Sequence, residues 1–173
     1  MEDSEQMEEV KRMKRILTLS GILLTMIILI NGSTVAGTTH WIVDVAWENH
    51  CTNPDNAEGP YDGKYASIGE NPDTPGEILL DFGAGNGIPN GYEFTVYASS
   101  SVYETYDVSV NTAADNDDHT YVGRGGDTGD ENFNAPATGG PWRYVYIDCV
   151  FGDEYNLDPA FGPEIDAVSW YEP

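Results

Sequence analysis

The sequence predicts an all-β protein, a two-sheet antiparallel sandwich of the jelly-roll type that follows an N-terminal hydrophobic leader helix. Three observations support this prediction. No long helical period appears after residue 37, and short runs rich in β-branched and aromatic residues recur instead. Gly, Pro, Asn and Asp separate these runs. About eight evenly spaced strands in one domain fit a jelly roll.

Each β-rich run is interpreted as one strand. The predicted strands cover residues 41–47, 65–68, 77–82, 92–98, 103–110, 120–122, 143–150 and 165–171. In the run before residue 150, Val145, Ile147 and Cys149 alternate with polar or aromatic neighbours, so these three are expected to face the core. Residues 123–140 contain six glycines and are expected to be the longest irregular segment.

Residues 1–37 are typical of a signal peptide or a signal anchor. A basic cluster at residues 11–15 precedes an apolar run of 15 residues, and small residues follow it up to Gly37. A membrane-spanning helix needs about 20 apolar residues, so the short run favours a cleaved signal, with cleavage near Ala36, over an anchor. Residues 38–173 would then form a secreted or cell-surface domain, touching a membrane only through an uncleaved leader.

The charge of the chain is strongly negative. The formal net charge is −23, and after Ala36 the sequence has 25 acidic residues against three basic ones, Lys64, Arg124 and Arg143. Such a surface repels nucleic acids and anionic membranes, so both are excluded as partners. Solubility alone explains most of the acidic residues.

Two cysteines, Cys51 and Cys149, lie in the part of the chain that is predicted to be exported. An even number of cysteines outside the cell favours a disulfide bond. Closing a loop of this size would constrain the unfolded chain by about 4–5 kcal/mol. The alternative is a pair of buried thiols, and the spacing excludes a CxxC redox or zinc motif.

Two segments could supply oxygen ligands to a hard cation. Residues 53–69 combine turn residues with oxygen-bearing side chains, and residues 164–168 place two carboxylates on one face of an extended segment. A fold that brought both segments together would create a site for a cation such as calcium. The predicted ligands are Asn53, Asp55, Asp62, Glu164 and Asp166. The alternative is ordinary turn chemistry, because Asn-Pro and Asp-Gly are common turn pairs.

These segments also carry a resemblance to a family. The motifs NPDNAEGPYDGKYASIG, GEILLDFG, YEFTVYA, YDVSV, RYVYIDCV and EIDAVSW resemble those of secreted galactose-binding-like (discoidin-like) jelly-roll modules, over residues 41–171. The markers are an N-terminal NP-x-x-A-x-G-x-x-DG pattern and a C-terminal DAV pattern. The resemblance implies a module that binds glycans or other surface ligands. It also implies a structural calcium ion and a disulfide that ties the two ends of the domain.

The predicted function is that of an exported, non-catalytic, calcium-stabilised module that binds cell-surface or environmental carbohydrate. Glycan sites combine aromatic platforms with polar groups, which selects four candidate ligand-binding residues: Tyr61, Trp142, Arg143 and Tyr155. The same residue types also fill the cores and edges of β-sandwiches. The alternative function is a structural component of a cell-envelope or extracellular assembly.

The sequence does not predict an enzyme. It contains no GxSxG, HExxH or P-loop motif. None of the three histidines, His40, His50 and His119, accompanies a nucleophile motif. His119 follows an acidic turn and is expected to be exposed.

Overall fold

The computed structural model describes residues 36–69, 76–99, 105–114, 118–126, 129–150 and 162–173. These residues form a two-sheet antiparallel β-sandwich, which confirms the predicted sandwich. The predicted leader helix lies outside the described residues. The described strands are β1 (Thr38–Trp41), β2 (Asp44–Asn49), β3 (Cys51–Thr52), β4 (Ala66–Ile68), β5 (Glu77–Asp81), β6 (Glu93–Ser99), β7 (Tyr106–Asn111), β8 (Thr120–Gly125), β9 (Gly129–Asn134), β10 (Tyr144–Cys149) and β11 (Glu164–Glu172). A short 3-10 helix, η1, covers Pro54–Ala57. Within this described part, no helix is long and apolar enough to cross a membrane.

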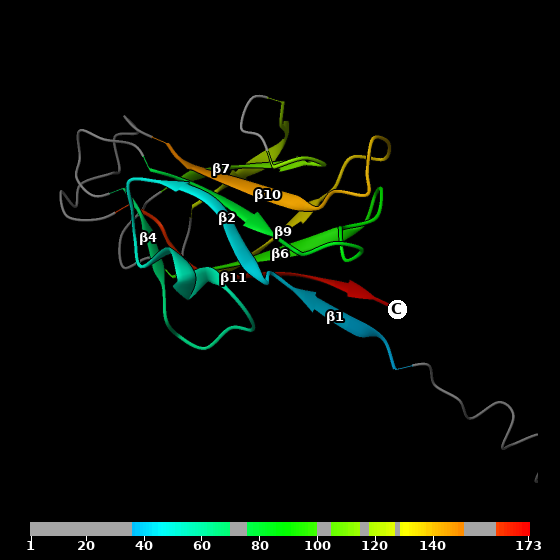
Figure 1. Cartoon of the computed structure of the whole chain (residues 1–173), viewed down its shortest axis with the longest axis horizontal. Helices are drawn as coiled ribbons and strands as arrows, with labels where there is room; N and C mark the ends of the chain where they lie inside the picture. Colours follow the sequence, from blue (N-terminus) through cyan, green and yellow to red (C-terminus); the bar gives the residue numbers. More distant parts are fainter. Residues whose placement is uncertain (1–35, 70–75, 100–104, 115–117, 127–128, 151–161) are drawn as a thin grey trace, which may run out of the picture. The chain divides into compact units, whose positions relative to one another are not determined.

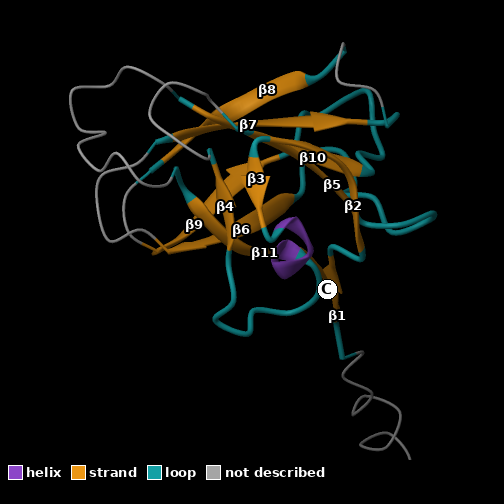
Figure 2. Cartoon of the chain, turned by 60° about the vertical axis from the view of Figure 1, so that its left-hand side comes forward, coloured by secondary structure: helices purple, strands orange, loops and turns teal. Residues whose placement is uncertain are grey.

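The strands divide into two layers (Figures 1 and 2). Sheet A has the order β3-β4-β11-β6-β9, with β1 also paired to β11, and sheet B has the order β2-β5-β10-β7-β8. The predicted strand over residues 41–47 is wrong, because the chain changes sheets inside it. The Ile42 amide donates to the Val168 carbonyl of sheet A at 3.1 Å, and the next amide, of Val43, donates to the Asp81 carbonyl of sheet B at 2.9 Å.

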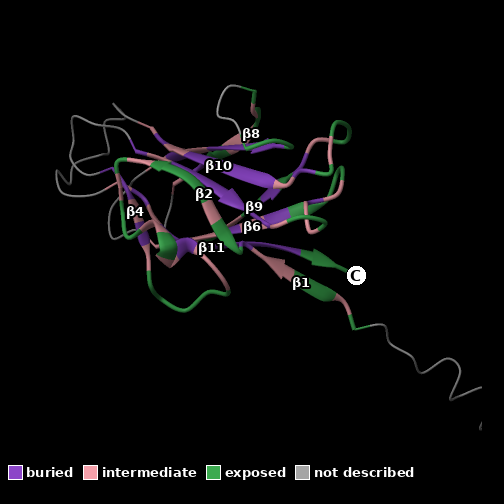
Figure 3. Cartoon of the chain, in the orientation of Figure 1, coloured by how far each residue is buried: buried purple, intermediate pink, exposed green. Residues whose placement is uncertain are grey.

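The core lies between the two sheets (Figure 3). Val145 and Ile147 are fully buried and Cys149 is 4% exposed, which confirms the alternation predicted for β10. On the facing layer, Phe94 and Val96 of β6 are buried in the same cluster. The outward-facing side chains of β10 are buried as well, because Tyr144 and Tyr146 form a second cluster, with Leu79, on the other side of sheet B.

Strand β9 and the second half of β8 occupy part of the segment that was predicted to be irregular. Two of its glycines, Gly123 and Gly125, lie in a strand and pack closely against aromatic rings. A Cβ at Gly123 would lie 3.1 Å from the Phe133 ring, and a Cβ at Gly125 would lie 2.4 Å from the Tyr106 ring. The missing side chains therefore let the β8 backbone approach these two aromatic rings closely.

Asp166 joins β11 to the segment between η1 and β4. The pairing of β11 with β6 shifts by one residue between Ile165 and Ala167, so Asp166 forms a β-bulge. Its side chain is 1% exposed, and it accepts hydrogen bonds from the backbone amides of Asp62 at 3.0 Å and Gly63 at 2.6 Å. The buried carboxylate therefore fixes the 62–63 turn across the outer side of β11.

We expect the substitution Asp166→Asn to lower the free energy of unfolding by about 2 kcal/mol, because an amide nitrogen would then face one of these two donors. Urea unfolding followed by tryptophan fluorescence measures the change. The matched control is Asp130→Asn, an exposed residue of β9, which should stay within about 0.5 kcal/mol of the wild type. Equal stability of both variants would contradict the anchoring role of Asp166.

Candidate functional site

The outer face of sheet B carries a row of residues to which each of its five strands contributes one. The register places these residues side by side in the order Trp47, Leu79, Tyr146, Ser109 and Tyr121, here called the central row. The two ends of the row are open to solvent, since Trp47 is 36% and Tyr121 is 59% exposed. The middle is closed, because Leu79 and Tyr146 are 1% and 7% exposed. The central row therefore has a closed middle, here called the floor, with an exposed aromatic ring at either end.

Two β-bulges put these rings on the outer face. In β2, Val45 pairs with Leu80 on the core side, and regular alternation would turn Trp47 inward as well. The register skips Ala46, so Trp47 instead pairs with the outward-facing Leu79.

The second bulge acts in the same way on β8. There Gly123 pairs with the core residue Val108, and the register then skips Val122. Tyr121 consequently pairs with the outward-facing Ser109. Each exposed aromatic ring of the central row thus faces outward because its own strand contains one inserted residue.

Polar rows flank the central row on both sides. One contains Asn49, Glu77, Asp148, Asp107 and Arg124, and the other contains Asp44, Asp81, Tyr144 and Asn111. Both arginines of this region are held by carboxylates. Arg124 forms two hydrogen bonds to Asp107 at 2.8 and 3.1 Å, and Arg143 forms two to Asp81 at 2.7 and 2.6 Å. The face therefore offers mainly hydrogen-bond acceptors and no loosely held cation among its described residues.

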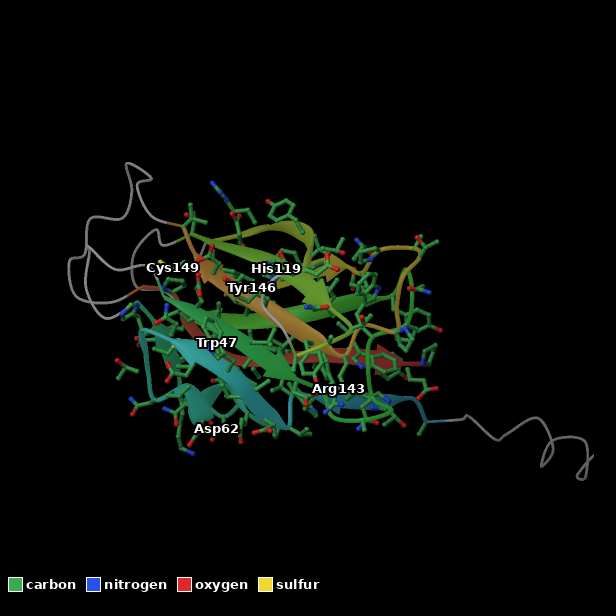
Figure 4. All side chains as sticks on the ribbon, turned by 45° about the horizontal axis from the view of Figure 1, so that its top comes forward. Trp47, Asp62, His119, Arg143, Tyr146 and Cys149 are labelled. Carbon is green, nitrogen blue, oxygen red and sulfur yellow. The ribbon has the colours of Figure 1, made fainter. Side chains whose placement is uncertain are left out.

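His119 covers part of the central row. Its ring stacks on Tyr146 with centroids 4.2 Å apart and an interplanar angle of 15°. Figure 4 shows both rings and Trp47 on the same face. His119 is half-buried, so the expectation that it is exposed is wrong. Its Nδ1 atom is buried and has no hydrogen-bond partner among the described residues, which leaves one polar atom of this face unsatisfied.

One carboxylate of the first polar row, that of Asp148, is perturbed by burial and by its neighbours. Burial, followed by the negative charges of Glu77 and Asp107, raises the pKa of Asp148 to about 6. Burial, together with the charges of Glu77 and Asp148, also raises the pKa of the Tyr146 phenol above its ordinary value. Tyr146 therefore stays neutral and makes a hydrogen bond with Glu77.

The three predicted ligand-binding residues that the structure describes do not come together. Arg143 lies at the edge of the sheet B face, where its guanidinium also lies over the Tyr144 ring at 5.0 Å. Trp142 is 6% exposed and packs in the core, so its ring is not presented to a ligand. Tyr61 is 55% exposed but lies against Tyr97 of sheet A. Tyr155 lies outside the described residues.

The two segments predicted to bind calcium do meet, because Glu164 pairs with Ser67 and Asp166 binds the 62–63 turn. Their side chains do not form a cage for a cation. Asp166 is occupied by two amides, and the Asp62 carboxylate binds the Lys64 ammonium at 2.7 Å. The described residues contain no group of three or more His, Cys, Asp or Glu side chains suited to a metal. Calcium held by Asn53, Asp55, Asp62, Glu164 and Asp166 stays a prediction that this arrangement does not itself support.

The predicted disulfide is not formed in the structure. Cys51 lies in sheet A, and its thiol donates to the Glu77 carbonyl at 3.3 Å. Cys149 lies in sheet B, and its amide donates to the carbonyl of the neighbouring Gly76 at 2.9 Å. A bond between the two sulfur atoms would therefore tie sheet A to sheet B.

Comparison with known proteins identifies the fold. No protein-family profile matches the sequence, and no curated protein matches it. The structure is similar to chitosan-binding module 1 of a chitosanase/glucanase from Paenibacillus sp. IK-5, with a TM-score of 0.51 and 14% identity over 79% of this chain and 93% of that one. It is also similar to CBM29_1, a family 29 carbohydrate-binding module from Piromyces equi, with a TM-score of 0.48 and 14% identity over 80% and 92% of the two chains. The sandwich is compatible with the galactose-binding-like fold that the motifs imply.

The raised pKa of Asp148 predicts a pH-dependent stability. The unfolded carboxyl ionises near its ordinary value of 3.8 and the folded one near 6, so the ionised form destabilises the fold increasingly as pH rises between these values. We expect Asp148→Asn to raise the free energy of unfolding at pH 7.5 by about 1 kcal/mol, a figure reduced for partial solvent screening. Urea unfolding at pH 7.5 and at pH 4 measures the effect, which should shrink at pH 4. A gain of the same size at both values would rule out this electrostatic origin.

Proposed function

We propose that the chain is an exported, non-catalytic carbohydrate-binding module, and that the outer face of sheet B binds the carbohydrate. The single observation that carries the proposal is the central row, in which Trp47 and Tyr121 are exposed at the two ends of a closed floor made of Leu79, Tyr146 and Ser109. Apolar ring faces of this kind contact the C–H faces of sugar rings, and polar groups beside them bind the hydroxyls. Strands lie about 4.8 Å apart, so the row is roughly 19 Å long and can take several sugar units.

The flanking rows supply the polar part of such a site. Glu77, Asp148 and Asn49 offer acceptors or an amide along one side of the row, and Asp44 offers a carboxylate along the other. Sugar hydroxyls both donate and accept hydrogen bonds, so they can satisfy this mixture of groups.

The charge of the face selects among carbohydrates. Arg124 and Arg143 are already bound to carboxylates, and the exported part of the chain has a large excess of acidic residues. An anionic polysaccharide would meet an uncompensated negative surface. We therefore expect uncharged or amino-sugar polymers to bind and acidic ones not to bind.

Two further observations support this proposal. The fold is shared with a module whose name describes chitosan binding, an analogy at the level of the fold. The basic cluster, apolar run and small residues at the start of the sequence support export.

The test is the binding of Trp47→Ala to polysaccharides. Removing the ring from an exposed end of the row should weaken binding by about 2 kcal/mol, which is roughly 30-fold in the dissociation constant. Retention on columns of cellulose, chitin, chitosan and mannan measures binding, and alginate serves as the acidic polymer that should not bind.

The control variant is Tyr92→Ala, which removes another partly exposed ring, 39% exposed, outside the sheet B face. It should bind as tightly as the wild type. Equal losses for Trp47→Ala and Tyr92→Ala would indicate a general effect on the fold. Absence of retention on all four neutral or amino-sugar columns would contradict the proposed function.

A further inference from the structure

The outer face of sheet A carries a separate group of aromatic side chains. Trp41 comes from β1, Tyr97 from β6, and Tyr61 and Tyr65 from the segment between η1 and β4. The ring of Tyr97 lies 5.4 Å from that of Trp41 and 5.8 Å from that of Tyr61, with interplanar angles of 35° and 39°. Tyr61 and Tyr65 are joined by a hydrogen bond between their side chains. These four residues form one continuous surface, here called the Tyr97 platform.

The platform rests on a part of the sheet that is already closed. Ala167 and Ser169, which pair with Tyr97 and Thr95 on the outer side of β11, are 0% and 4% exposed. The Tyr97 hydroxyl also lies 3.3 Å from the Ser169 hydroxyl. The rings are thus held against rigid strands, while Tyr61 remains 55% exposed. An aromatic surface fixed in this way loses little side-chain entropy when a ligand binds to it.

Polar groups lie beside the platform on β9. Asp130 pairs with Tyr97, Asn132 pairs with Thr95, and both β9 side chains are exposed. The Thr95 hydroxyl donates to Asn132 Oδ1 at 2.8 Å, which leaves the Asn132 amide nitrogen as the donor of that side chain. The face therefore combines aromatic rings with one acceptor and one donor, the groups that a sugar chain requires.

Charge decides which occupant fits this face. Lys64 is the basic residue nearest to Tyr61 and Tyr65 in the sequence, and its ammonium is bound to Asp62 at 2.7 Å. An acidic ligand would therefore find no compensating cation among the described residues of the platform. A second copy of this chain would bring another strongly negative surface into contact with this one. An uncharged polymer needs no compensating cation and is not repelled by the negative surface.

We propose that the Tyr97 platform is a second carbohydrate site, which binds one uncharged polysaccharide chain independently of the sheet B face. This inference rests on the proposed function of the sheet B face. The outer faces of two packed sheets point in opposite directions. One molecule therefore holds two polysaccharide chains at once and cross-links them.

The experiment measures cross-linking and binding together. The full chain is produced by an exporting host and mixed with soluble β-glucan or glucomannan, both uncharged, and light scattering is recorded. The wild type should raise the scattering. Tyr97→Ala and Trp47→Ala should each lower that rise by about tenfold, because a variant with one remaining binding site cannot cross-link two chains. Each single variant should still be retained in affinity electrophoresis, and the double variant should not.

A second variant guards against loss of folding. Tyr61→Ala removes an exposed ring and should lower the scattering about threefold with unchanged thermal unfolding. Tyr92→Ala is the control that should behave as the wild type.

The outcomes separate the two proposals. Full cross-linking by Tyr97→Ala, or loss of all binding in Trp47→Ala alone, would overturn the second site and leave the proposed function intact. Loss of all binding in Tyr97→Ala alone would support the platform and refute the sheet B site. Absence of binding by the wild type would refute both. A wild-type dimer that Tyr97→Ala converts to a monomer would show that the platform binds another copy instead.

Discussion

The alternation of side chains along a β-strand is the constraint on which both outer faces of this sandwich depend. A one-residue bulge reverses that alternation, and a reversed residue changes from one side of the sheet to the other. The bulges at Ala46 and Val122 turn Trp47 and Tyr121 away from the core, and the bulge at Asp166 accompanies the anchoring of a turn across β11. The same backbone device therefore arranges an apolar row on one sheet and supports the aromatic surface on the other.

Much of the fold could be predicted from the sequence because local patterns determine it. Alternation correctly assigned Val145 and Ile147 to the core, and the two end segments that share the predicted oxygen ligands do lie together. The prediction failed where tertiary contacts override local signals. Glycine normally signals a turn, but Gly123 lies in a strand, where a Cβ would be only 3.1 Å from the Phe133 ring. The change of sheet at Ile42 has no local signal at all, since both halves of that segment favour a strand.

The candidate site was less accessible to sequence reasoning, for a physical reason. A bulge depends on the partner strand, so the sequence of β2 alone does not reveal that Trp47 faces outward. The acidic turn before His119 suggested an exposed ring, whereas stacking on Tyr146 holds it half-buried. Conversely, Trp142 was predicted to bind a ligand because of its residue type, but its side chain packs in the core. Tyr61 is exposed, as a ligand-binding ring must be, but Tyr97, the ring that it lies against, comes from a strand far away in the sequence.

The pairing of β1 with β11 has a mechanical consequence. Thr38 pairs with Glu172, so the chain enters and leaves the sandwich on neighbouring antiparallel strands. Tension applied between these two ends loads one backbone pair at a time, as in opening a zipper, instead of shearing all pairs together. β1 has four such pairs and belongs to sheet A. A pull on the ends therefore peels β1 away, taking Trp41 with it, before the strain reaches any strand of sheet B.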